Sequence, residues 1–233
     1  MLPQLTLLKG IALDILFPRW CVGCGREGDL LCHWCRRSLP GITPPLCPRC
    51  GRPQASGVLC PGCISWQAQV DGIRSPFQFD GVVRQAIHQL KYKNLRALAI
   101  PLAGLLRDYL AANPVPAEVL VPVPLHPKRL RERGYNQSSL LVRELGRLTG
   151  LPVVSDCLMR QRHTPPQVRT STVDERRRNL ANAFACRDHR LQGRQILLVD
   201  DVATSGATVD ACAAALKAAG AASVWALVLA REI

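Results

Sequence analysis

The chain has 233 residues, of which 48% are hydrophobic and 5% aromatic, and its 30 Lys/Arg against 17 Asp/Glu give a formal charge of +13. This length suits one α/β domain of ordinary size with a small additional module, and it contains no apolar run of about 18 residues that would predict a transmembrane helix. Between positions 119 and 190 there are 14 Lys/Arg against 6 Asp/Glu, so this region suits a polyphosphate or a nucleic-acid backbone as partner.

Residues 1–18 open the chain with an apolar stretch that Lys9 and Asp14 interrupt and that no small-residue cleavage site follows. A signal peptide is therefore not expected, and we predict an amphipathic helix that packs on the body of the protein, with a role at a membrane surface as the alternative. Without an export signal or a membrane span, the expected location is the cytoplasm, peripheral at the inner face of the membrane under the alternative.

Residues 19–66 carry eight cysteines in four pairs of the form Cys-X-X-Cys, which is a metal-binding pattern rather than a disulfide pattern. Four thiolates close one tetrahedral Zn²⁺ site, so two structural sites are expected, and the segment should not fold without metal. Short connections favour sequential pairing of the knuckles, with a cross-braced arrangement as the alternative. In sequential pairing the ligands are Cys21, Cys24, Cys32 and Cys35 at the first site and Cys47, Cys50, Cys60 and Cys63 at the second.

A linker is expected from residue 64 to Pro76, where a second domain begins that occupies residues 76–233. Alternating apolar residues predict an edge strand at 77–80, and helical spacing predicts helices at 82–92 and 95–112. Lys91 lies at the end of the first of these helices, where a basic residue ordinarily serves the helix dipole and solvation. A ligand-binding role for this lysine is the alternative.

A strand at 119–123 leads into a basic, proline-containing loop at 124–137, and a helix then runs to Gly150. Another strand is expected at about 153–160. The polar, proline-containing segment at 161–171 precedes a helix that opens with a capping box.

The most informative stretch follows, with an apolar strand at 196–199, a loop of small and hydroxyl residues, and an Ala-rich helix at 209–219. A loop of this kind leaves the first N–H groups of the helix free to bind a phosphate. Asp200 and Asp201 precede the loop, and because carboxylates are poor phosphate ligands, ribose hydroxyls or a hydrated Mg²⁺ fit beside them. The stretch therefore predicts a pocket for a 5-phosphorylated ribose.

This stretch resembles the signature of the type I phosphoribosyltransferases, which implies an α/β fold with a Rossmann-like parallel sheet. The alternative is another doubly wound α/β protein whose strand ends in acidic residues. The resemblance implies that the loop binds the 5-phosphate of phosphoribosyl pyrophosphate (PRPP) and that the acidic pair, as the catalytic residues, binds its ribose hydroxyls. The implied PRPP-binding residues are Asp200, Asp201, Ala203, Thr204, Ser205, Gly206, Ala207 and Thr208.

In the same fold, the loop after the first core strand binds pyrophosphate. A departing diphosphate needs several cationic donors, and guanidinium groups meet phosphate oxygens in pairs. The resemblance therefore implies a pyrophosphate-binding role for the basic loop, with a solvated surface turn as the alternative. The residues concerned are Lys128, Arg129, Arg131 and Arg133.

The zinc knuckles and five further motifs, all in one order, resemble the ComF family of bacterial proteins, a double zinc ribbon joined to a phosphoribosyltransferase domain. The resemblance covers nearly the whole chain and implies two Zn²⁺, Mg²⁺ with PRPP, and a role in natural competence or the use of DNA. The motifs are HQLKY at 88–92, VPVPLHPKRLRERGYNQ at 121–137, TPPQ at 164–167, RRN at 177–179 and the loop after the acidic pair.

Two functions from different classes are consistent with these residues. In the first, the protein is a PRPP-dependent phosphoribosyltransferase whose acceptor the sequence does not identify. In the second, the pocket reads phosphate with little or no turnover, in a module that binds single-stranded DNA and a competence helicase. The intact acidic pair favours the first, because a phosphodiester backbone gives two aspartates nothing to neutralise. The basic region and the zinc ribbons favour the second.

Overall fold

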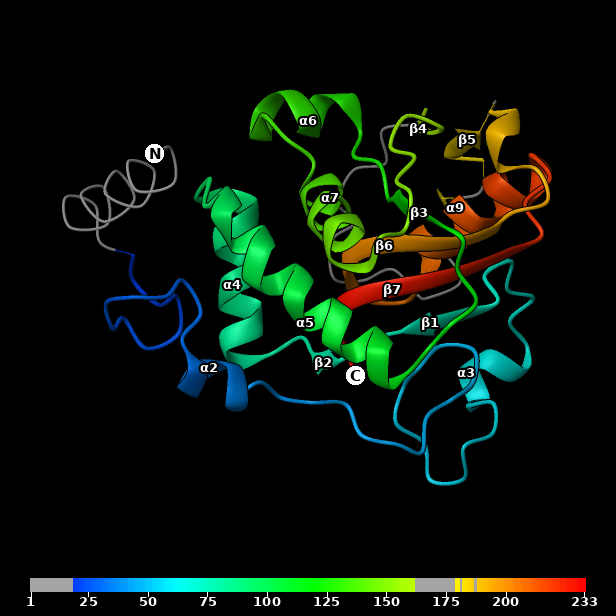
Figure 1. The fold of residues 1–233 in the computed structure, drawn as a ribbon. Coiled ribbons are helices and arrows are strands. Elements are labelled where there is room, and N and C mark those ends of the chain that lie inside the picture. The colour runs from blue at the N-terminus through cyan, green and yellow to red at the C-terminus, as the bar shows by residue number, and fades with distance from the viewer. Residues whose placement is uncertain (1–18, 162–178, 181, 187) are drawn as a thin grey trace.

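The computed structural model describes residues 19–161, 179–180, 182–186 and 188–233, which form a parallel sheet between helices with the cysteine-rich segment along one side (Figure 1). The helix predicted at residues 1–18, nearly all of the polar segment after position 160 and the capping box lie outside the described residues. Among the described residues, every helix is too short or too polar to cross a membrane.

The central sheet is parallel throughout. Its strand order is β1–β7–β6–β3, and β2 pairs with β7 beyond the end of β1. The two central strands are buried almost along their whole length, as expected of parallel strands covered on both faces. The predicted α/β class with a Rossmann-like parallel sheet is confirmed. The strands are β1 (Gly72–Arg74), β2 (Phe77–Gln78), β3 (Val119–Pro122), β6 (Gln195–Ala203) and β7 (Ser223–Arg231).

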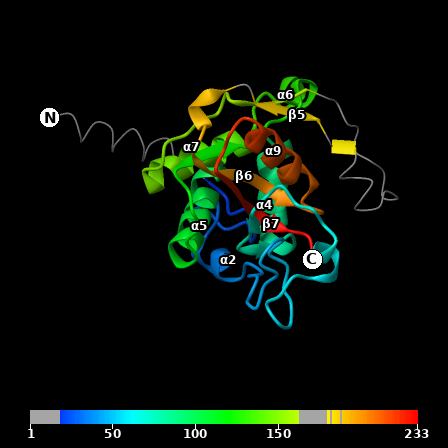
Figure 2. The ribbon, with the colours of Figure 1, turned by 90° about the vertical axis from the view of Figure 1, so that its right-hand side faces the viewer.

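Helices cover the two faces of the sheet unequally (Figures 1 and 2). Alternate residues of a strand point to opposite faces, so Leu197 and Val199 pack with one set of helices, while Ile196 and Leu198 pack with α9 (Ala207–Ala218). The first set consists of α4 (Gly81–Tyr92), α5 (Ala99–Ala112), which the short η1 (Arg96–Leu98) precedes, and α7 (Gln137–Thr149).

The structure differs from the sequence-based expectation in two stretches that border the sheet. Strand β6 continues through both aspartates to Ala203, because its pairing with β7 extends to Arg231. The segment expected as a linker contains β1 and buries Trp66 and Val70 in the core. Both differences have the same cause: pairing with β7, a contact distant in sequence, creates strand structure that local periodicity does not show.

The segment expected as a basic loop contains a short helix, α6 (Pro127–Arg133). Proline at the first helical position is pre-organised for a helix start, the His126 side chain accepts a hydrogen bond from the Lys128 N–H, and Gly134 ends the helix with a φ of 78°. The strand expected at 153–160 is a single bridge from Val153 to Leu120 followed by β4. The remaining elements are α2 (His33–Arg37), α3 (Pro61–Ile64), β4 (Leu158–Arg160), which pairs antiparallel with β5 (Phe184–Cys186), and η2 (His189–Leu191).

Candidate functional site

The eight knuckle cysteines form two clusters, in each of which the four sulfurs lie within 4.8 Å of one another. The Sγ atoms of Cys24 and Cys32 are 3.6 Å apart and those of Cys50 and Cys60 are 3.7 Å apart. Four sulfurs at about 2.3 Å from one ion in a tetrahedron would be separated by roughly 3.8 Å, so both sets fit Zn²⁺. The pairing is sequential, as the short connections favour, and not cross-braced. The first ribbon holds Cys21, Cys24, Cys32 and Cys35, and the second ribbon holds Cys47, Cys50, Cys60 and Cys63.

The two aspartates lie near the carboxyl end of β6, the edge at which ligands of open parallel sheets bind. Asp200 is 8% exposed and Asp201 is 3% exposed. The Ser138 hydroxyl donates to Asp200 Oδ1 at 2.7 Å, and the Asp201 N–H donates to the same oxygen at 2.9 Å. Burial and then the charge of Asp201 raise the pKa of Asp200 to about 7, against the opposing effects of the Ser138 hydrogen bond and of Lys91.

Lys91 completes the acidic pair from the last turn of α4. Its Nζ lies 2.6 Å from Asp201 Oδ2, and the two side chains are 20% and 4% exposed. The sequence favoured a helix-dipole role for this lysine, whereas the structure pairs it with Asp201, and a ligand-binding role stays a prediction. Its position at a helix end is consistent with either a helix-dipole role or a ligand-binding role. Only the packing of α4 against the sheet brings this lysine to the aspartates. Tyr135 supports that helix end by donating its hydroxyl to the Leu90 carbonyl.

Residues 204–206 form the turn after β6, and residues 207–208 begin α9. We call residues 204–208 the phosphate loop. Gly206 has a φ of 79°, and a Cβ there would lie 2.9 Å from Ile73 and 3.3 Å from Trp66, so only glycine fits. No side chain caps α9 at this glycine, and the Ser205 hydroxyl accepts a hydrogen bond from the Ala207 N–H at 3.4 Å. The loop therefore presents hydroxyl and N–H groups directly after the acidic pair.

The four basic residues predicted to bind pyrophosphate divide between two faces of α6. Arg129 and Arg133 are partly buried and line a cavity of about 660 Å³ that Lys91 and Tyr92 also line. Lys128 and Arg131 are exposed and are not among the residues that line it. A helical period of 3.6 explains this division, because residues four apart share a face. Through Lys91 the cavity adjoins the acidic pair.

Arg160, at the end of β4, is a further cation near this site that the sequence did not indicate. Burial lowers its pKa, as does the neighbouring Arg129, while the nearby Cys212 and Asp200 oppose this effect. Its guanidinium also lies over the Phe184 ring, 5.5 Å from the centroid. No local pattern could have identified it, because the strand that carries it is only three residues long.

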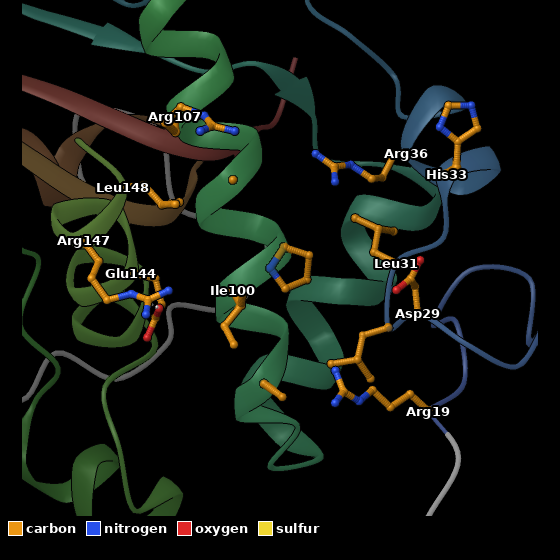
Figure 3. Close-up of a pocket in the computed structure, with 14 residues that line it drawn as sticks. Arg19, Asp29, Leu31, His33, Arg36, Ile100, Arg107, Glu144, Arg147 and Leu148 are labelled. Atoms are coloured by element: carbon orange, nitrogen blue, oxygen red, sulfur yellow. Dashed lines mark ion pairs between the residues drawn. The ribbon is translucent and has the colours of Figure 1, made fainter. Parts of the chain in front are cut away.

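A second cavity, of about 470 Å³, lies between the first ribbon and helices α5 and α7 (Figure 3). None of the residues predicted to bind PRPP or pyrophosphate lines it. Four arginines from three parts of the chain surround it, together with the exposed side chain of Ile100. We call it the arginine cavity, and its arginines are Arg19, Arg36, Arg107 and Arg147.

Comparison with known proteins identifies relatives over most of the chain. Residues 12–64 match the family model of the double zinc ribbon domain. The chain is 34% identical over 210 residues to the DNA utilization protein YhgH of Salmonella typhi, covering 87% of this chain and 91% of that protein. It is 29% identical over 220 residues to the competence protein ComFC of Bacillus subtilis (strain 168), covering 89% and 86%, respectively.

Among solved structures, the glutamine PRPP amidotransferase from B. subtilis aligns with a TM-score of 0.39 and 19% identity. That alignment covers 56% of this chain and 26% of the amidotransferase chain. At this level of similarity, membership of a family rests on the sequence relatives.

Proposed function

The chain belongs to the ComF family of competence and DNA-utilisation proteins, and we propose that its α/β domain binds PRPP and transfers the phosphoribosyl group to an acceptor. The observation that carries this proposal is the buried acidic pair, held by Ser138 and Lys91 and followed by the phosphate loop that begins α9. Anionic phosphate alone gives two carboxylates no favourable contact, whereas ribose offers two hydroxyl donors. The pair therefore supports a ligand that contains both a sugar and a phosphate.

The rest of PRPP would occupy the groups on either side of that pair. The 5-phosphate would accept hydrogen bonds from the phosphate loop, where the helix dipole also favours an anion. The diphosphate would lie toward the 660 Å³ cavity, where Arg129, Arg133 and Lys91 supply cationic donors. Carboxylate oxygens are a donor type that fits hydrated Mg²⁺, and such an ion, when bound, would neutralise part of the diphosphate charge.

In the reaction, the bond between ribose C1 and the diphosphate oxygen breaks, and an acceptor forms a new bond to C1. The diphosphate leaves with the electron pair of the broken bond. Positive charge develops on the ribosyl group as the bond lengthens, and the anionic charge of the leaving group grows. Arg129 and Arg133 would stabilise the leaving group, while Asp200 and Asp201 hold the ring in place through its hydroxyls. Both zinc sites are closed by four sulfurs and would have a structural role.

The second candidate function is binding of single-stranded DNA, and the arginine cavity favours it. The cavity combines four guanidinium groups and an exposed aliphatic side chain with two acidic residues, Asp29 and Glu144, and it is separate from the acidic pair of β6 (Figure 3). Arginines in a groove attract the phosphate backbone of a single strand. DNA could thus bind on the first-ribbon side while PRPP occupies the α/β site. A competence helicase as partner and a cytoplasmic location stay predictions.

Calorimetry with PRPP and Mg²⁺ tests the main proposal. Wild-type protein should bind, and Asp200→Asn/Asp201→Asn should lose binding because the ribose hydroxyls lose their carboxylate acceptors. The charge-matched control is Asp108→Asn/Asp156→Asn, since these side chains are 52% and 72% exposed. The control should bind as wild type does. Unchanged binding in the first variant would refute the pocket, and equal loss in both would attribute the effect to net charge.

A further inference from the structure

Arg231, the last residue of β7, is a buried arginine for which no carboxylate provides an ion pair within the described part of the chain. It is 1% exposed. Its Nη2 lies 3.5 Å from the Thr204 carbonyl oxygen, while its Nε and Nη1 have no hydrogen-bond partner among the described residues. Burial of an uncompensated guanidinium is costly, so a compensating anion is expected close by.

The second ribbon supplies that anion. Arg231 approaches the same Thr204 carbonyl oxygen as Arg52, which lies two residues after Cys50. Burial lowers the pKa of Arg231, as does Arg52, whereas Cys50, Cys63 and Cys60 act in the opposite direction. Four thiolates around Zn²⁺ carry a net charge of about −2. Arg52 is the second cation there, and its Nε is also buried without a hydrogen-bond partner in the described structure. Two guanidinium groups thus balance one zinc–thiolate centre.

Both arginines also converge on one backbone oxygen of the phosphate loop. Arg52 Nη2 lies 3.3 Å from the Thr204 carbonyl oxygen, and Arg231 Nη2 approaches the same atom. Because the peptide unit is planar and trans, fixing this carbonyl also fixes the direction of the Ser205 N–H. The start of the phosphate loop is therefore oriented by two arginine side chains, one of which, Arg52, lies two residues after the zinc ligand Cys50.

Packing strengthens the same connection. Arg49 donates from Nη1 to the Cys63 and Trp66 carbonyl oxygens at 2.9 and 2.6 Å, which ties Trp66 to the second ribbon. The Trp66 ring in turn lies against Gly206 of the phosphate loop. In Figure 2, the carboxyl end of β7 lies beside the chain of this ribbon. The second ribbon is thus in contact with the loop through both polar and apolar side chains.

We propose that Arg52 and Arg231 are positioning residues that couple the second zinc site to the phosphate loop, so that occupancy of this site by zinc sets the affinity for the phosphorylated ligand. The ligand part of this inference rests on the proposed PRPP function. Coupling between two sites is reciprocal, so bound ligand should also slow the loss of zinc from the second ribbon. The first ribbon has no contact of this kind with the loop within the described residues.

Hydrogen exchange of the ligand-free protein tests the coupling independently of PRPP. Arg52→Met and Arg231→Met should accelerate exchange of the Asp210 amide, which donates to the Gly206 carbonyl oxygen of the loop at 3.0 Å, by about tenfold, as expected when a local opening becomes easier. The control is Arg74→Met, which removes hydrogen bonds to the Pro48 and Ile73 carbonyl oxygens at the same ribbon but has no contact with the loop. Unchanged exchange in both test variants, or equal acceleration in the control, would overturn the inference.

Ligand binding provides the second arm. Cys60→Ser and Cys32→Ser are matched, because each cysteine is third in its cluster and donates its N–H to a sulfur of that cluster at 3.4 Å. Cys60→Ser should weaken PRPP binding at least about tenfold, within the usual range of coupling, and Cys32→Ser should not. Should Cys60→Ser fail to fold, Arg52→Met takes its place with the same expectation. Equal affinities in all variants would refute the coupling, whereas absence of binding in wild type would refute the proposed function and leave the exchange result decisive.

Discussion

The two zinc ribbons have the same ligands and the same knuckle geometry, yet they have different relations to the α/β domain. In the first ribbon, Cys21 and Cys35 pack with residues of α4 and α5, and the arginine cavity lies alongside. In the second ribbon, Cys47, Cys50 and Cys63 belong to the core that includes α9 and one face of the sheet. Each ribbon thus packs into the core on a different face of the sheet, with two buried ligands in the first ribbon and three in the second.

This difference shows that a metal motif predicts a metal site but not its role in a fold. Both cysteine patterns predict a loop that bound zinc stabilises locally. The additional role of the second ribbon depends on residues outside the pattern, chiefly Trp66, Arg52 and Arg231, which connect it to the phosphate loop. We therefore expect perturbations of the second ribbon to affect the stability of the domain and the ligand site, and perturbations of the first ribbon to affect mainly the arginine cavity.

The largest difference is expected on removal of one zinc ligand from each ribbon. Cys60→Ser should destabilise the domain by about 4 kcal/mol, because a site within the core is disrupted, and should lower its melting temperature by roughly 8–16 °C. Cys32→Ser should leave the main transition nearly unchanged and release one zinc. Calorimetric melting with metal analysis measures both. Equal shifts in the two variants would show that both ribbons are equally integrated.

A smaller difference is expected from a pair of glycines at the same position of the two knuckles. Gly25 and Gly51 have φ values of 69° and 71°. A Cβ at Gly25 would have nothing within 4 Å, whereas a Cβ at Gly51 would lie 2.4 Å from the Ile73 carbonyl oxygen. Gly25→Ala should therefore cost about 1 kcal/mol for backbone strain alone, and Gly51→Ala about 3 kcal/mol, because strand β1 must also move. Urea unfolding of both variants gives the comparison, and similar free energies of unfolding would argue against close packing of the second ribbon on the sheet.

The sequence predicted features that depend on neighbouring residues better than contacts between residues distant along the chain. The strand before Asp200, the phosphate loop and α9 were predictable, because apolar runs and turn residues act over a few positions. The cysteine knuckles were predictable because four thiolates need that spacing. The ion pair of Lys91 with Asp201 was not, since it joins residues more than a hundred positions apart. Helix α6 was also missed, because prolines were interpreted as loop residues although Pro127 lies at a favourable helix start.

The acidic pair, which contacts Ser138 of α7 and Lys91 of α4, gives a pH-dependent difference. Asp200 has a folded pKa of about 7 against an ordinary value of 3.8. Over that window the folded state binds more protons than the unfolded state, so stability falls as the pH rises. Asp200→Asn removes this effect, and its stability relative to wild type should increase by about 2 kcal/mol between pH 5 and pH 8. Urea unfolding at both pH values measures it, with exposed Asp156→Asn as control. A difference that does not change with pH would contradict the buried environment of Asp200.

The smallest effect in free energy is expected on the first-ribbon side, where the arginine cavity is exposed to solvent. Arg36→Gln/Arg147→Gln should weaken binding of single-stranded DNA at low salt, because each phosphate contact that is lost reduces the salt slope of log K by about 0.7. PRPP affinity should be unchanged, since neither residue lies near the acidic pair. Fluorescence anisotropy across a salt series measures the slope. The charge-matched control, Arg143→Gln/Arg194→Gln, removes arginines that do not line the cavity.

This last comparison also separates two ways in which the chain could combine DNA and PRPP. If DNA binds at the arginine cavity, the slope falls only in the cavity variant, and saturating PRPP leaves DNA affinity unchanged because none of the residues proposed to bind PRPP lines that cavity. If the strand instead contacts Arg129 and Arg133, the cavity variant keeps the wild-type slope and PRPP competes with DNA for the same cations. Competition would place both functions on the phosphate-loop side and leave the first ribbon with a structural role alone.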